Sequence, residues 1–186
     1  MKRTAILAAG LLASCHASHT VTAENASVNQ VADQVKTVAA AGGMPSPGHW
    51  QANMTVTRMD IPDVPAAMAD RMKVALGKSH VIDSCLTKQE AEKPKGDFFG
   101  AMDKSCRYDH FTMGGGKIDA KMTCAMQGGQ QVMVMNGRYG ADSYAMTVST
   151  DLTGTGPMGK MSSTTTIDAH RTGACTGTED NLKNGG

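Results

Sequence analysis

The 186-residue sequence predicts a mainly β fold, with a single antiparallel curved sheet or partly closed barrel of about seven strands, one or two short helices and disulfide bracing. Apolar and polar residues alternate in several segments, which is the pattern of half-buried strands. Glycine-rich stretches separate these segments, as expected for hairpins. Four cysteines lie in the same region, an even number that can pair as two disulfides.

An export signal opens the chain. Two basic residues precede an apolar run over residues 4–12 that is too short to span a bilayer. Residues 12–15, with the sequence Leu-Ala-Ser-Cys, have the pattern of a bacterial lipobox. We therefore expect residues 1–14 to be a lipoprotein signal peptide and Cys15 to become the lipidated N-terminus. Simple secretion after cleavage near residues 21–23 is the alternative.

The expected location is the cell envelope, lipid-anchored and facing the periplasm. His16 follows Cys15 in place of the Asp that marks retention in the inner membrane, so the outer membrane is favoured. Loss of the two basic residues of the signal leaves 16 Lys and Arg against 17 Asp and Glu, a net charge of −1. This balance, with few aromatic residues, gives no basis for binding nucleic acid. The expected partners are the membrane, through the lipid, and a small apolar ligand or an envelope protein.

Residues 15–44 are predicted to be a lipid-anchored tether that carries one short helix. The first part of the tether, residues 16–30, is small and polar. Four valines then recur at helical spacing: Val28, Val31, Val35 and Val38. Two glycines, Gly42 and Gly43, end this predicted helix.

The β domain is predicted over residues 45–176, followed by a flexible tail over residues 177–186. Alternation that starts at Trp50 predicts its first strand. A second, short strand is expected over residues 79–85. The polar residues 86–104 are expected to form a loop with a helical turn.

A helix is predicted between these two strands. Pro65 suits its first turn, and Gly77 ends it. Met68, Met72 and Leu76 are spaced so that they share one face of this helix.

A hairpin around three consecutive glycines is the clearest unit of the chain. Its strands are predicted over residues 106–113 and 117–126, joined by Gly114 to Gly116. Centring the hairpin on Gly115 gives four facing pairs: Cys106 with Cys124, Tyr108 with Met122, His110 with Ala120, and Thr112 with Ile118. Three further strands are predicted over residues 130–138, 143–150 and 160–170.

The facing positions of Cys106 and Cys124 favour a disulfide between them, because directly opposed residues lie close enough for a bridge. That pairing leaves Cys85 with Cys175. The alternative, Cys85 with Cys106 and Cys124 with Cys175, stays open on the sequence alone.

Methionine is abundant, with 15 residues in the chain. Thioethers bind soft ions such as Cu(I), so a Met-rich sheet face is a rival hypothesis of copper binding. The residues concerned are Met122, Met126, Met133, Met135 and Met146. All of them occupy strand positions that alternate with polar residues and would otherwise hold Leu or Val. This placement favours a role in packing the core over a role in binding a metal.

No catalytic residues are assigned, and no cofactor is expected. The six histidines form no metalloprotease motif, and the chain has no nucleophile elbow or phosphate loop. Asp109 and His110 are neighbours on a strand, so their side chains point to opposite faces. A curved sheet could hold one small apolar molecule, although a filled interior is favoured. The expectation is therefore a non-enzymatic binding or envelope-interaction module.

Several separated landmarks resemble one known family. Residues 47–50 read Pro-Gly-His-Trp, residues 85–87 read Cys-Leu-Thr, and residues 170–175 read His-Arg-Thr-Gly-Ala-Cys. With Cys106 and Cys124 around a glycine hairpin, they resemble a proteobacterial family of small exported proteins, the domain of unknown function 3617. The resemblance covers residues 45–175, with His170 in place of the small residue expected there. It implies an exported architecture and assigns no catalytic residues.

Overall fold

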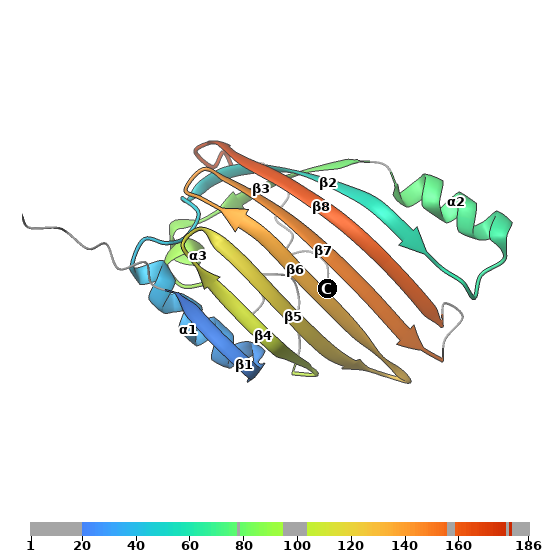
Figure 1. Cartoon of the computed structure of the whole chain (residues 1–186). Helices are drawn as coiled ribbons and strands as arrows, with labels where there is room; N and C mark the ends of the chain where they lie inside the picture. Colours follow the sequence, from blue (N-terminus) through green and yellow to red (C-terminus); the bar gives the residue numbers. More distant parts are fainter. Residues whose placement is uncertain (1–19, 78, 95–103, 156–158, 178, 180–186) are drawn as a thin grey trace, which may run out of the picture.

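A computed structural model of the chain describes residues 20–77, 79–94, 104–155, 159–177 and 179. The described strands are β1 (Val21–Ser27), β2 (Gly48–Asp60), β3 (His80–Leu86), β4 (Cys106–Gly114), β5 (Lys117–Met126), β6 (Gly129–Tyr139), β7 (Ser143–Gly154) and β8 (Lys160–Gly173). The described helices are α1 (Val28–Ala40), α2 (Ala66–Leu76) and α3 (Lys88–Glu92). The predicted mainly β fold is confirmed, with eight strands and three helices (Figure 1).

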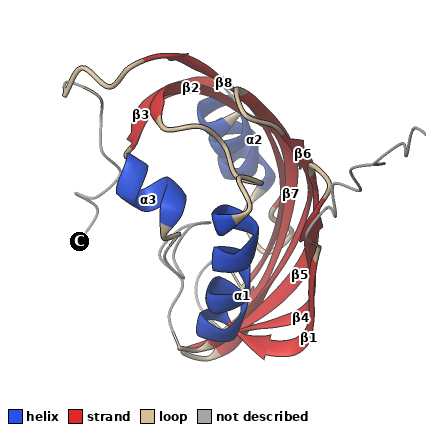
Figure 2. Cartoon of the chain, turned by 90° about the vertical axis from the view of Figure 1, so that its left-hand side faces the viewer, coloured by secondary structure: helices blue, strands red, loops and turns tan. Residues whose placement is uncertain are grey.

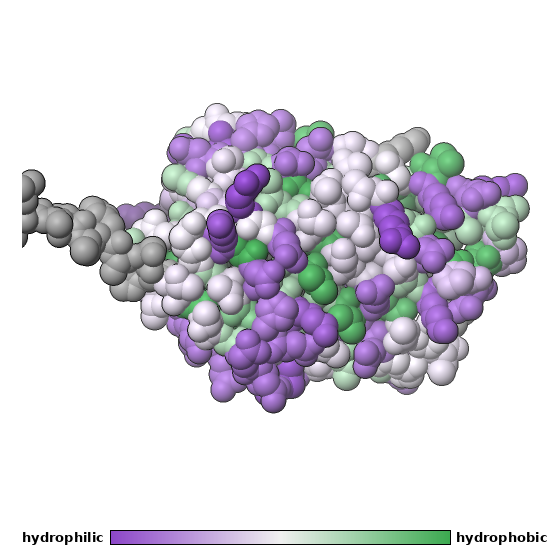
Figure 3. Space-filling model, in the orientation of Figure 1, coloured by the Kyte–Doolittle hydropathy of each residue, from purple (hydrophilic) through white to green (hydrophobic). Residues whose placement is uncertain are grey.

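All eight strands belong to one antiparallel sheet in the order β1-β4-β5-β6-β7-β8-β2-β3. The sheet is strongly curved but does not close, so β1 and β3 form its two edges (Figure 2). Helices α1 and α3 lie on the concave side. Figure 1 looks onto the convex side, where hydrophilic and weakly polar side chains predominate (Figure 3). The two faces differ because apolar and polar residues alternate along each strand.

The N-terminal part of the folded body corrects the tether expected over residues 15–44. Residues 21–27 form β1, which pairs with β4, and α1 follows directly. Ser27 and Gln30 form a capping box at the start of α1. The four valines at helical spacing are all buried, so α1 is part of the core and not of a tether.

The β4–β5 hairpin corrects part of the predicted register. Cys106 faces Cys124 as expected, but a bulge between Tyr108 and His110 shifts the strand by one residue. A one-residue shift moves every later side chain to the other face. Phe111 and Met113 therefore point inward in place of His110 and Thr112, so that Phe111 faces Ala120 and Met113 faces Ile118.

Two clusters of buried residues form the core. The larger cluster joins α1 to the inward residues of β1, β4 and β5 and to Met135 of β6. In it, the rings of Tyr108 and Phe111 make an edge contact at 5.2 Å between centroids. The smaller cluster contains Trp50, Ala52 and Ala169. The core is therefore densest at the α1 end of the sheet.

Helix α2 extends beyond the end of β2 and is poorly packed (Figure 1). Ala69 is its buried residue, whereas Met68 and Leu76 are 56% and 43% exposed. The face that carries Met68, Met72 and Leu76 is therefore not buried against the sheet. No helix among the described residues is both long and apolar enough to cross a membrane.

Candidate functional site

The structure contains the hairpin disulfide. Cys106 and Cys124 are bonded on the inward faces of β4 and β5, and both are buried. Cys85, at the end of β3, is bonded to Cys175, which follows β8 and is exposed. The second bridge joins segments that lie 90 residues apart in the sequence. The alternative pairing that the sequence left open is not formed.

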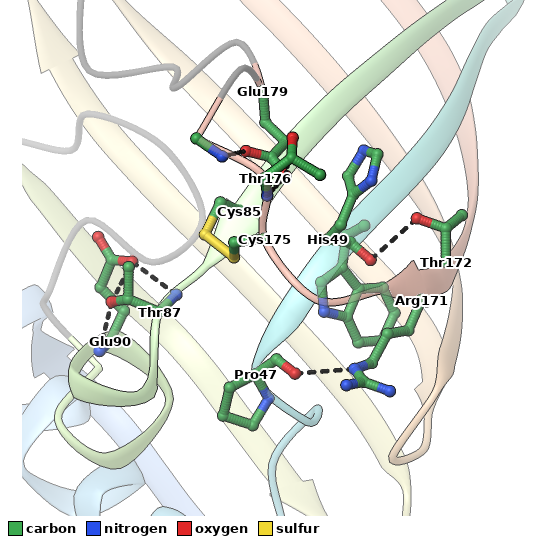
Figure 4. The surroundings of a disulfide bond; sticks show 12 residues. Pro47, His49, Cys85, Thr87, Glu90, Arg171, Thr172, Cys175, Thr176 and Glu179 are labelled. Atoms are coloured by element: carbon green, nitrogen blue, oxygen red, sulfur yellow. Dashed lines mark hydrogen bonds between the residues drawn. A yellow bond between two sulfur atoms is a disulfide. The ribbon is translucent and has the colours of Figure 1, made fainter.

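The Cys85–Cys175 bridge lies beside a closely packed junction of the ends of β2 and β8 (Figure 4). The Arg171 Nε donates to the backbone carbonyl of Pro47 at 2.7 Å, and its guanidinium is 3.7 Å from the Asp142 carboxylate. The indole N–H of Trp50 donates to the Ser46 carbonyl at 3.0 Å. These contacts hold the segment before β2 in place, so they have a structural role.

Glu179 fixes the chain after Cys175. Its carboxylate accepts hydrogen bonds from the backbone N–H groups of Thr176 at 2.6 Å and Gly177 at 2.8 Å. Hydrogen bonds from the backbone N–H groups of Thr176 and Glu179, and then of Gly177, lower the pKa of the Glu179 carboxyl to about 2, against the opposing effect of desolvation. The group is therefore ionised at neutral pH and serves as a local anchor.

Two histidine–carboxylate pairs lie on the convex side. The Nε2 of His110 is 2.7 Å from the Asp119 carboxylate, and that of His49 is 2.9 Å from the Asp83 carboxylate. The expectation that Asp109 points to the opposite face from His110 is wrong, because the bulge in β4 places both side chains on the convex side. The Asp109 carboxylate lies 3.1 Å from the Lys121 ammonium group and does not contact His110. Among the described residues, no group of three His, Cys, Asp or Glu side chains has a geometry that could hold a metal.

The five methionines of the copper hypothesis lie in different environments. Met122 and Met135 are buried in the larger core cluster, and Met133 and Met146 pack against it. Met126, at the end of β5, is 47% exposed. Four of the five therefore contribute to the apolar core. Cys15, the predicted lipidation site, lies outside the described residues.

A different part of the concave face has the character of a binding surface. On β7, β8 and β2, away from α1, eight inward side chains are only half-buried and belong to neither core cluster. We call this set the open concave surface: Met54, Val56, Met59, Thr150, Leu152, Met161, Ser163 and Thr165. Half-buried apolar side chains that lie together on one face form a candidate interaction surface.

The open concave surface combines apolar and hydroxyl groups. Register places Leu152 beside Met161, and Thr165 between Val148 and Val56. Three neighbouring strands, and the four residue steps from Met161 to Thr165 along β8, give a patch of roughly 10 by 13 Å. Such a patch can accept an apolar chain or small ring and offers the Ser163 and Thr165 hydroxyls to one polar group.

The fold and this surface define a disulfide-braced, open β-sheet domain with an accessible apolar concave face. A family described as "Protein of unknown function (DUF3617)" matches residues 45–175, which is more than half of the chain, so the chain belongs to the DUF3617 family. No curated protein and no solved structure matches the chain. The landmarks at residues 47–50, 85–87 and 170–175 all lie around the Cys85–Cys175 junction, where their contacts support the fold.

Proposed function

We propose that this chain is a periplasm-facing lipoprotein, anchored through Cys15, that binds an apolar ligand without catalysing a reaction. The half-buried apolar side chains of the open concave surface support the ligand-binding part of this proposal, and the lipobox pattern of residues 12–15 supports the anchor. A sheet whose inward face served only as a core would bury Met161 and Val56 as completely as it buries Met122.

The ligand that fits best is an amphiphile with one acyl chain. Its chain would lie against Met54, Met59 and Met161, whose unbranched thioether side chains adapt to different shapes. Its polar group would hydrogen-bond to the hydroxyls of Ser163 or Thr165. A lipid-anchored domain at the membrane surface would meet such molecules at high local concentration.

Two neighbouring threonines of β8 give a matched test. Thr165 points to the concave side and Thr166 to the convex side, and both are half-buried. Thr165→Glu introduces a negative charge into the proposed site, whereas Thr166→Glu makes the same change on the opposite face. We expect Thr165→Glu to weaken binding of an anionic fluorescent fatty acid by tenfold or more, and Thr166→Glu to leave it unchanged.

Both variants add the same charge to β8, so a difference in probe affinity between them reports which face of the sheet binds the probe. Equal thermal unfolding of the two variants establishes that both are folded. Equal probe affinity for the two variants, or the absence of saturable binding to the unmodified protein, would contradict the proposed site.

The anchor has a separate test, because Cys15→Ser should release the protein from the membrane fraction on cell lysis. Retention of that variant in the membrane fraction would contradict lipidation at Cys15.

A further inference from the structure

The convex face carries a groove of about 770 Å³ over β6, β7, β8 and β2. It is lined on the β7 side by the small outward residues Ser143 and Ala145. Longer side chains flank them on both neighbouring strands, with Arg138 on β6 and Asp168 and His170 on β8. The groove exists because the middle strand has short side chains where its neighbours have long ones.

One end of the groove is cationic. Arg138 is exposed and faces Lys117 of β5 directly in the register of the sheet. Neither side chain makes a hydrogen bond or ion pair with any described residue. Like charges that lie directly opposite each other on a sheet repel. An anionic group placed between Arg138 and Lys117 would remove this repulsion and gain charge-assisted hydrogen bonds.

The other side of the groove is polar and has unused hydrogen-bonding capacity. Register places Asp168 beside Asn53 and His170 beside Gln51. The side chains of Asp168 and His170 make no hydrogen bond with any described residue. The Asp168 carboxylate accepts hydrogen bonds, the two amides both donate and accept them, and the His170 imidazole can do either. A ligand with hydroxyl groups on adjacent carbons can both donate to and accept from these side chains.

We propose that this groove binds an acidic saccharide. The carboxylate of the sugar lies at Arg138 and Lys117, and its hydroxyls lie at Asp168, His170 and the amides of Gln51 and Asn53. The Gln51 amide also donates to Asp83 at 3.4 Å and the Asn53 amide oxygen accepts from Ser79, which leaves the second polar atom of each amide for the sugar. The strands of Arg138 and Asp168 are separated by two strand spacings, roughly 10 Å, which a sugar ring between the two side chains spans. The site is on the opposite face from the open concave surface and does not depend on it.

Two tryptophan substitutions on β7 test the position of the site. Ala145→Trp fills the groove, and Thr147→Trp places the same side chain one pleat further along the same face, outside it. Digalacturonate added to the full chain should shift the backbone amide signals of Arg138, Ser143 and Asp168 in proton–nitrogen correlation spectra. Ala145→Trp should abolish these shifts, and Thr147→Trp should retain them.

Two charge substitutions test the chemistry. Arg138→Gln removes the groove cation, and Lys160→Gln removes an exposed cation of β8 that is not part of the groove. We expect Arg138→Gln to weaken digalacturonate binding about tenfold, as for loss of one charge-assisted hydrogen bond, and Lys160→Gln to have no effect. Lactose, a neutral disaccharide, should bind more weakly than digalacturonate and be insensitive to Arg138→Gln.

Three results would overturn this proposal. The first is the absence of saturable shifts with digalacturonate at millimolar concentration. The second is retention of the shifts in a folded Ala145→Trp protein. The third is an equal response to sodium acetate at the same carboxylate concentration, because this would show that the cations attract any anion and that the hydroxyls contribute nothing.

Discussion

Arg171 occupies the space that a side chain at residue 48 would need. A Cβ atom placed on Gly48 would lie 2.5 Å from the Arg171 Nε and would also overlap the Gly173 carbonyl oxygen. Gly48 has a φ of 147°, a value that residues with a Cβ atom rarely adopt. The glycine of the Pro-Gly-His-Trp landmark thus packs against the arginine and the glycine of the last landmark, more than 120 residues later. This contact joins two landmarks that lie far apart in the sequence.

Gly48→Ala should therefore destabilise the fold strongly. The added methyl group must displace Arg171 from Pro47 or move the backbone of Gly173, and an alanine is strained at this φ. We expect a loss of about 3 kcal/mol in the free energy of unfolding, measured by urea denaturation. Gly154→Ala is the control, since its Cβ would meet only ordinary contacts at 3.5 Å or more. A Gly48→Ala protein as stable as the control would contradict this account.

The two disulfides should differ in their reactivity. Cys175 is exposed and Cys85 half-buried, whereas Cys106 and Cys124 are buried beneath α1. Reaction of a disulfide with an external thiol requires access to its sulfur atoms. Limited reduction followed by alkylation and mass spectrometry should label Cys85 and Cys175 first. Earlier or equal labelling of Cys106 and Cys124 would count against the described packing.

Loss of each bridge should also have a different energetic cost. The Cys85–Cys175 bridge closes a loop of 90 residues and the Cys106–Cys124 bridge one of 18. Loop-closure entropy then predicts losses of about 4.6 and about 3.2 kcal/mol for the paired Cys→Ser variants, in that order. Urea denaturation of the two double variants measures both free energies of unfolding and shows which bridge contributes more.

All three tyrosines should titrate abnormally. Burial raises the pKa of Tyr108 to about 12 and also raises the pKa values of Tyr139 and Tyr144 from the ordinary value of 10.0. The folded state therefore favours the neutral phenol. This contribution to stability is fully present below pH 10 and is lost as the pH rises from about 10 toward 12. Tyrosinate absorbance should rise at lower pH in urea than in the native protein, and coincident curves would contradict the burial of Tyr108.

Much of the sheet could be predicted from the sequence, because alternation and glycine-rich turns are local signals. The β4–β5 hairpin, with Cys106 opposite Cys124, is such a case. The bulge after Tyr108 was missed because the prediction assumed an unbroken two-residue period. The greater hydrophobicity of Phe111 and Met113 over His110 and Thr112 is the signal that could have revealed it.

Strand β1 was missed for a related reason. Its inward residues Val21, Ala23 and Ala26 do not alternate evenly, because Asn25 adopts a positive φ of 47° and breaks the period. The open concave surface could not be predicted either. Alternation shows that Met161 and Thr165 point inward, but only the position of α1 decides which inward side chains are buried.

The methionine methyl groups offer the most direct test of the central claim, that one part of the concave face is core and another part binds an apolar ligand. NMR spectra of the protein with isotopically labelled Met methyl groups, titrated with a single-chain fatty acid, monitor both parts at once. We predict saturable shifts for Met54, Met59 and Met161, with Met122 and Met135 unchanged. Shifts confined to Met122 and Met135, or no shift at Met54, Met59 and Met161, would contradict the claim.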